Sequence, residues 1–369
     1  TFAHSVAASE GGPRGDPVLS KLLASDLKNF MLLCDECHRL IDKVNPAKYT
    51  VEVLQKMRED SIADVKRLLD SLQHKPAEVV AILGNIAGQP PQFSMDDAQE
   101  ALWGQGLRSS EAKVSRYFYP GGQHHDVHSV AYWMSLFQQM RRDLPLLQTL
   151  LDGTRSGAAR PRLAVFPLHS TSVLVLTGRV LGDNAGTHLF QLHRNKVGEG
   201  TRWAWPRDAA PTPALDKFKV EVLQPHTAGQ DEAALVVALT SDIDAKRMPA
   251  NCARSGELLL PTLRVTGPTF DKDCVQQPQD LQLVGLAVDS AMRVLQDEWR
   301  VRRVHLFVSS PASVAVALGQ KMQARHHAEY VCHEALPGPG AAYKATIEIT
   351  PTLVRELVSG QANIHPLQH

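Results

Sequence analysis

The sequence predicts an α/β fold, and three observations support this prediction. The chain has 369 residues, of which 43% are hydrophobic and 21% charged, which suffices for two or three ordinary globular cores. From Arg162 onward, short apolar runs alternate with amphipathic stretches, a pattern typical of a largely parallel sheet covered by helices. The third observation is an internal repeat.

Each expected element follows from the spacing of its apolar residues. We expect strands at 163–167, 187–192, 220–222, 234–240, 304–308, 329–332 and 344–350, and helices at 51–72, 131–151, 171–181, 281–298 and 312–322. Residues 76–160 as a whole read as a mostly helical connector, and 153–161 reads as a linker or domain entry.

A shift of 141 positions overlays residues 162–178 on residues 303–319. The identical pairs are Arg162/Arg303, Phe166/Phe307, Ser172/Ser313, Val173/Val314, Val175/Val316 and Gly178/Gly319. In both copies a strand leads through a short polar loop into a helix that carries a glycine. We infer two fused units of common origin, the alternative being chance similarity between two generic strand–helix units.

The repeat also predicts where a ligand would bind. Ligands of open α/β sheets bind beyond the carboxyl ends of the strands, where helix N-termini attract phosphate. Loops 168–172 and 309–313 should therefore face one shared groove, suited to a ligand with two or more phosphates. Neither loop is a P-loop or a GxGxxG motif, so nucleoside triphosphate and NAD chemistry have no support.

Charge and cysteine usage exclude several classes of protein. Lys and Arg total 39 and Asp and Glu total 39, so bulk charge does not drive binding to nucleic acid or to anionic membranes. No apolar run approaches the ~18 residues that span a bilayer. Five cysteines do not make a disulfide scaffold, so we expect a reducing, cytoplasmic location.

The sharpest motif is Cys34-x-x-Cys37-His38. A CxxC pair is half of a structural zinc site, and the chain has no second pair, so we expect the missing pair upstream of Thr1. His38 and Asp42 lie four residues apart and share one helix face, where they could hold a divalent cation. The other cysteines have no metal spacing and are predicted to be ordinary thiols, namely Cys252, Cys274 and Cys332.

Together with His4 and Asn29, this motif resembles the HNH endonucleases, a ββα-metal family, cut short at its N-terminus. The resemblance implies that His4 is the general base, that Asn29 orients it through a backbone hydrogen bond and that His38 and Asp42 hold Mg²⁺ or a similar ion. It also implies a structural Zn²⁺ on Cys34 and Cys37. Many HNH sites have Asp or His directly before the base, where this chain has Ala3.

The second half resembles the SAVED domain, a fusion of two CARF-like Rossmann-type units that senses cyclic oligonucleotides. The segments that carry this resemblance are 163–167, 176–183, 203–206 and 305–315. An HNH module followed by SAVED resembles the effector nucleases of CBASS anti-phage systems. The domains would be 1–75 (HNH), 76–160 (helical connector and start of the sensor) and 161–369 (SAVED).

This combined resemblance implies a DNase that cuts double-stranded DNA when a cyclic di- or trinucleotide binds and drives the chain into a homo-oligomer, a tetramer or higher. Residues 1–75 carry 11 basic and 11 acidic side chains, so firm DNA binding would need several copies. The alternative is a non-catalytic nucleotide-sensing regulator whose degenerate HNH module only binds DNA or a partner.

Candidate ligand-binding residues cluster in the second half. Phe166, Trp203 and Trp205 could stack on bases, and Arg194 or Lys321 could pair with phosphate. Loop residues at the start of a helix could hold phosphate through N–H and hydroxyl groups. The whole candidate set is Phe166, Pro167, Arg194, Trp203, Trp205, Ser309, Ser310, Pro311, Ser313 and Lys321. Core packing is the alternative for Phe166 and for one tryptophan, and helix capping is the alternative for Ser309 and Ser313.

Overall fold

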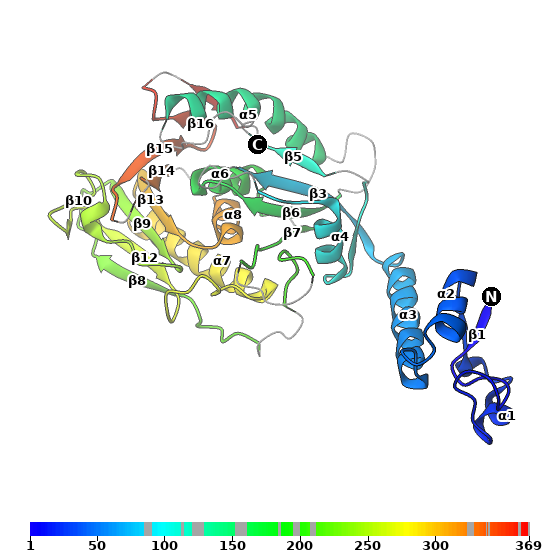
Figure 1. Ribbon diagram of the computed structural model, residues 1–369. Helices are drawn as coiled ribbons and strands as arrows, with labels where there is room; N and C mark the ends of the chain where they lie inside the picture. Colours follow the sequence, from blue (N-terminus) through cyan, green and yellow to red (C-terminus); the bar gives the residue numbers. More distant parts are fainter. Residues whose placement is uncertain are drawn as a thin grey trace. The chain divides into compact units, whose positions relative to one another are not determined.

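A computed structural model gives the architecture (Figure 1). It describes residues 1–84, 91–111, 114–119, 129–151, 161–183, 186–194, 200–206, 212–322, 328–336, 338, 340–360 and 363–367. The chain divides into two compact units, Thr1–His74 and Lys75–His369. Among the described residues, no helix is both long and apolar enough to cross a membrane.

The first unit is small and has a small hydrophobic core. Its elements are β1 (Phe2–His4), α1 (Leu19–Leu23), η1 (Leu27–Asn29), β2 (Phe30–Leu32), α2 (Asp35–Arg39), η2 (Leu40–Val44) and α3 (Val51–Ser71). Strands β1 and β2 pair antiparallel, with His4 opposite Phe30. The buried apolar cluster of this unit contains Ala3, Met31, Ile41 and Leu54.

The second unit is built on two sheets. The first has the order β4 (Leu107–Ser109), β3 (Lys75–Leu83), β6 (Arg162–Leu168), β7 (Thr187–Leu189), and β5 (Ser115–Tyr117) also pairs with β3. The second has the order β17 (Ile364–Pro366), β16 (Leu353–Glu356), β15 (Tyr343–Ile349), β14 (Glu329–Ala335), β13 (Arg303–Ser309), β9 (Glu232–Ala238), β12 (Thr262–Thr266), β8 (Lys219–Gln224). Strands β10 (Ala253–Arg254) and β11 (Glu257–Leu258) form a separate hairpin.

The helices of this unit connect the strands and cover the sheets. They are α4 (Met95–Trp103), α5 (Val130–Leu151), α6 (Thr171–Leu181), η4 (Ala245–Arg247), α7 (Pro278–Arg293), η5 (Val294–Glu298) and α8 (Ala312–Lys321). Helix α6 contacts β14 and β15 of the second sheet, and α8 contacts β6 of the first. The two helices therefore form the layer between the sheets (Figure 1).

The two sheets repeat one topology. In chain order, the parallel strands β3, β4, β6 and β7 take the spatial order 2-1-3-4. The parallel strands β9, β12, β13 and β14 take the same order in the second sheet. This is the order of doubly wound folds. The shared topology supports the inference of two fused units from the 141-residue repeat.

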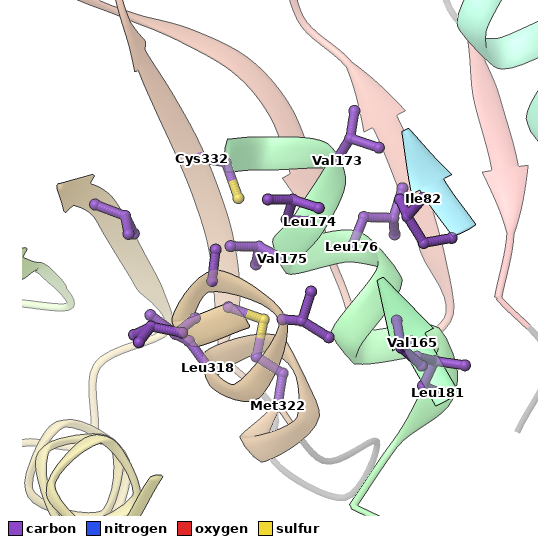
Figure 2. Close-up of a cluster of buried hydrophobic side chains, with 14 of the residues drawn as sticks. Ile82, Val165, Val173, Leu174, Val175, Leu176, Leu181, Leu318, Met322 and Cys332 are labelled. Atoms are coloured by element: carbon purple, nitrogen blue, oxygen red, sulfur yellow. The ribbon is translucent and has the colours of Figure 1, made fainter. Parts of the chain in front are cut away.

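Helices α6 and α8 meet at the two glycines that the repeat aligns. A Cβ on Gly178 would lie 2.0 Å from the carbonyl oxygen of Val316, and a Cβ on Gly319 would lie 1.9 Å from that of Val175. The contacts are reciprocal because Val175 and Val316 are themselves equivalent in the repeat. Figure 2 shows side chains of both helices entering one apolar cluster with Ile82 of β3. An approximate two-fold axis thus passes between the helices.

We expect Gly319→Ala to lower the free energy of unfolding by about 1–3 kcal/mol, because the new methyl group overlaps a backbone oxygen that cannot move alone. Gly285→Ala in α7 is the matched control, since its nearest neighbour would be the flexible end of Lys321 at 3.3 Å. That control should raise stability by up to about 1 kcal/mol through helix propensity. Urea unfolding measures both, and equal midpoints would contradict the close helix contact.

Most expected elements of the second half are confirmed, although the strand expected at 187–192 ends at Leu189 and the second sheet also contains antiparallel strands. The helical interpretation of residues 76–160 is wrong in part. Residues 75–83 form β3, which pairs along its length with β6 at the centre of the first sheet. Strand β3 lies before the expected boundary at 160 and β6 lies after it. Because these strands pair with each other, the first sheet is built from segments on both sides of that boundary. Residues 152–160, which include most of the expected linker, lie outside the described residues.

Candidate functional site

The first turns of α6 and α8 receive a side-chain acceptor from the opposite half of the second unit. The backbone N–H of Ser172 in α6 donates to Glu334 Oε1 of β14 at 2.6 Å. In α8, both the N–H and the hydroxyl of Ser313 donate to Gln191 Oε1, which follows β7, at 3.2 and 2.7 Å. These crossed bonds join the carboxyl ends of the two sheets at the edge where the repeat predicts a ligand.

The two crossed acceptors differ in charge. Glu334 can carry a negative charge, whereas Gln191 is neutral. Burial raises the pKa of Glu334, and the hydrogen bond from Ser172 opposes that rise. The helix N-termini are therefore not free donors: a phosphate at Ser313 would have to displace an amide, and one at Ser172 would have to displace a carboxyl group. This differs from the expectation that the start of α8 binds phosphate directly.

A hollow of about 630 Å³ lies beside this edge. Its lining is Pro91, Gln92, Asp97, Leu168, Leu192, Arg194, Gly200, Thr201, Arg202 and Trp203. The volume falls in the range of small-ligand sites. Within the described part of the chain, neither Arg194 nor Arg202 forms an ion pair with an acidic residue, and both are exposed. The hollow therefore offers positive charge beside the buried side chain of Trp203.

Phe166 lies in the core of this region. Its ring stacks on Phe190 at 4.5 Å and packs against Phe93 at 4.9 Å and Trp203 at 5.5 Å, with no exposed surface. Burial on this scale leaves no ring face for a base, so the stacking role expected for Phe166 does not fit the structure. Its neighbour Pro167 is also buried, within β6.

Trp203 and Trp205 are both largely buried, and neither lies in a strand, so the expected strand alternation is not observed. Trp203 lines the hollow of about 630 Å³, whereas Trp205 packs on His193 at 5.3 Å and lines a second hollow of about 470 Å³. Lys321 lines that second hollow too, paired with Asp183 at 2.5 Å. The ten candidates therefore do not share one groove.

The polar residues that follow β13 form their own bonds. Ser309 Oγ lies 2.9 Å from Thr240 Oγ1 and 2.7 Å from Ser241 Oγ. Ser310 donates to the carbonyl of Pro311, the N-cap residue of α8, which receives no side-chain cap. Ser309 and Ser313 therefore do not cap this helix in the usual way.

Sequence reasoning did not identify Gln191, Glu334 or Arg202 as part of this region. Gln191 and Glu334 bond partners 122 and 162 residues away, and the 141-residue shift does not align them with each other. Arg202 had a local signal, because it directly precedes the Trp203–Pro206 segment that carries the SAVED resemblance.

In the first unit, the side chain of Asn29 forms hydrogen bonds with the backbone just after His4. Its buried amide accepts from the N–H of Val6 at 2.8 Å and donates to the carbonyl of Val6 at 2.8 Å. The expected backbone bond thus reaches the residue two positions after His4. The His4 ring packs on Phe30 with centroids 4.4 Å apart. Both contacts restrict how the His4 segment can move.

His38 and Asp42 lie together, as their spacing predicts. His38 Nε2 is 3.1 Å from Asp42 Oδ2. The other carboxylate oxygen, Oδ1, is bound by Arg14 at 2.5 Å, and Arg14 also donates to the carbonyls of Ser5 and Ile41. Sequence reasoning did not identify Arg14. One nitrogen and one oxygen atom therefore remain adjacent for a cation, which fits a partial metal site.

Cys34 and Cys37 fit half of a zinc site. Cys34 is the N-cap of α2, and its Sγ accepts the N–H of Cys37 at 3.4 Å, a bond that lowers the pKa of the Cys34 thiol. Both cysteines are exposed. They supply two of the four ligands that a structural zinc ion requires.

Comparison with known proteins places the second unit in context. A family model described as "SMODS-associated and fused to various effectors sensor domain", SAVED, matches residues 146–349. No curated protein matches the chain. Residues 1–74 lie outside the matched range.

Among solved structures, the chain is similar to Cap4 SAVED/CARF-domain containing receptors. The Acinetobacter baumannii receptor with 3'3'3'-cAAA is 16% identical at a TM-score of 0.45, covering 74% of this chain and 52% of that one. The same receptor with 2'3'3'-cAAA is 14% identical at a TM-score of 0.45, and the match covers 81% of this chain and 61% of that one. The Moraxella osloensis receptor is 15% identical at a TM-score of 0.41, and the match covers 75% of this chain and 50% of that one. This chain thus spans half to about three fifths of the solved chains. Because the family model covers more than half of the sequence, the chain belongs to the SAVED family of sensor domains.

Proposed function

We propose that the chain senses a cyclic oligonucleotide in the hollow lined by Arg194, Arg202 and Trp203, and that residues 1–74 form an HNH-type endonuclease activated by this ligand. The observation that carries the sensor assignment is the position of this hollow. It lies beside the crossed starts of α6 and α8, at the carboxyl ends of β6 and β7. Doubly wound folds bind ligands at this edge.

The chemistry of the hollow suits a cyclic di- or trinucleotide. Each phosphate of such a ring carries one negative charge, and guanidinium groups bind phosphate through paired N–H donors. Arg194 and Arg202 are both exposed on its wall, while Leu168 and Leu192 supply apolar surface for sugars or bases. Asp97, also on the wall, favours contact with an N–H donor of a base over contact with phosphate.

The nuclease assignment rests on the resemblance of the first unit to HNH enzymes and on the geometry of its residues. His4 would take the proton of the attacking water, with its backbone held by the Asn29 bonds to Val6. His38 and Asp42 would hold a divalent ion, which supplies charge stabilisation at the scissile phosphate when bound. Arg14 fixes the orientation of the Asp42 carboxylate.

The experiment that tests this proposal uses the protein with plasmid DNA, Mg²⁺ and a panel of cyclic di- and trinucleotides. We expect cleavage only with one or a few ligands, and light-scattering mass that rises over the same titration, because assembly gathers several nuclease modules on one duplex. Calorimetric binding without cleavage would support a non-catalytic regulator instead. Absence of both binding and cleavage across the panel would overturn the sensor assignment as well.

Replacing both Arg194 and Arg202 with alanine should weaken ligand binding about 10²- to 10⁴-fold, the combined effect of two lost phosphate contacts. A hydrogen bond to a charged group contributes about 1.5–3 kcal/mol, and each 1.4 kcal/mol is about a factor of ten. The control is Arg293→Ala, an exposed arginine on α7 that pairs only with Asp289 among the described residues. Calorimetry measures all the affinities, and an unchanged affinity in the double variant would place the ligand elsewhere.

A further inference from the structure

The second unit contains a buried group of three metal-ligating side chains that plays no part in the proposed sensing. Cys252 follows η4, His305 lies on β13 and His333 lies on the neighbouring strand β14. Each offers one ligand atom, and these atoms lie within 4.8 Å of one another. The side chains are buried, with exposures of 0%, 5% and 4%. Across the described ranges, no other group of three such residues comes this close.

A carboxylate orients one of the two imidazoles. Glu232 Oε2 lies 3.1 Å from His305 Nε2, and Arg303 lies 3.6 Å from the other oxygen of Glu232. The Glu232 carboxylate is therefore a ready acceptor for a proton on His305 Nε2. That tautomer leaves His305 Nδ1 with a free lone pair, directed at His333 Nε2 at 3.1 Å.

Without a cation, this arrangement leaves a buried polar atom unpaired. One proton can lie between His305 and His333, but His333 Nδ1 then has no hydrogen-bond partner among the described residues. Within the described part of the chain, the thiol of Cys252 makes one hydrogen bond, a long one to Asn251 Oδ1 at 3.8 Å. Burial raises the pKa of Cys252 to about 12 and lowers that of His333 to about 3.

We propose that Cys252, His305 and His333 bind a Zn²⁺ ion, with Glu232 as the outer carboxylate. One sulfur and two imidazole nitrogens are ligands that zinc prefers. Bond lengths of ~2.0–2.3 Å set separations of about 3–4 Å between zinc ligands, so the three atoms, which lie within 4.8 Å of one another, would move slightly closer around the ion. A carboxylate bound to the far nitrogen of a zinc-ligating histidine is the usual outer partner. The ion would tie the segment after η4 to β13 and β14, and its fourth coordination position would be left to a water molecule.

The test uses the full chain carrying Cys34→Ser and Cys37→Ser, which removes the exposed thiols as a second zinc site. We expect elemental analysis to find about one zinc per chain and expect Co²⁺ to give a thiolate-to-metal absorption band. Adding Cys252→Ser should abolish the band and lower the zinc content at least tenfold. Cys332→Ser is the matched control, because Cys332 is a buried thiol on the same strand as His333, and it should change neither reading.

Two outcomes overturn the proposal. One is a folded Cys34→Ser/Cys37→Ser chain that holds no zinc and gives no cobalt band when either metal is supplied. The other is a zinc content that persists in the Cys252→Ser chain. If circular dichroism shows that the Cys252→Ser variant is unfolded, the test uses a chain in which Cys252 is the sole cysteine. Absence of the thiolate-to-Co²⁺ band in that chain counts against the proposal.

Discussion

His4→Ala should lower DNA cleavage about 10²- to 10⁴-fold while leaving the affinity for the cyclic nucleotide unchanged. The magnitude is that of removing a general base, and ligand binding persists because the hollow at Arg194 belongs to the other compact unit. The ring of His4 is only partly buried and packs on Phe30, so its removal should cost little stability. Supercoiled-plasmid cleavage under single-turnover conditions measures the loss.

The control for this prediction is His74→Ala. His74 ends the first unit, and its Nδ1 has no hydrogen-bond partner among the described residues, so its replacement breaks no described bond at that atom. Cleavage by the control should match the unmodified chain. Cleavage at the full rate by the His4 variant would exclude His4 as the base and favour a non-catalytic first unit.

Phe166→Ala should destabilise the second unit by about 3–5 kcal/mol, the cost of removing a fully buried phenyl ring. The ring fills the space between Phe93, Phe190 and Trp203, and these neighbours cannot all close the gap. Because a domain is stable by only about 5–15 kcal/mol, the loss should be plain in urea unfolding.

Phe270→Ala serves as the control, since its side chain is 45% exposed and its replacement should change stability by less than about 0.5 kcal/mol. The comparison also separates core packing from ligand stacking. If Phe166→Ala leaves stability intact and weakens only ligand binding, the ring reaches the ligand after all and the packing described above is incorrect.

The fold of the second half could be predicted because its elements are long and regular. The ends of the elements were predicted less accurately than the elements themselves. Helix α7, for example, begins at Pro278, three residues before the first residue with clear apolar spacing. Strand β3 was missed because residues 79–83 are buried on both faces and therefore form a continuous apolar run. Such a run lacks the alternation that marks a half-exposed strand.

The candidate site was predicted less completely, because its decisive contacts join distant parts of the chain. The 141-residue repeat located the edge where α6 and α8 start, but nothing local indicates that Gln191 would bond Ser313 or that Glu334 would bond Ser172. Cys252 likewise lacks any metal spacing, since the strands bring His305 and His333 to it from 53 and 81 residues away.

The exchange of acceptors between α6 and α8 makes the duplicated halves inseparable as folding units. A protein cut between them would leave the first donors of each helix without their side-chain acceptors, and each buried donor left unpaired costs about 1–3 kcal/mol. It would also separate the glycine surfaces that now meet backbone to backbone. Each half therefore depends on the other for its stability. We expect the second unit to unfold in a single cooperative transition.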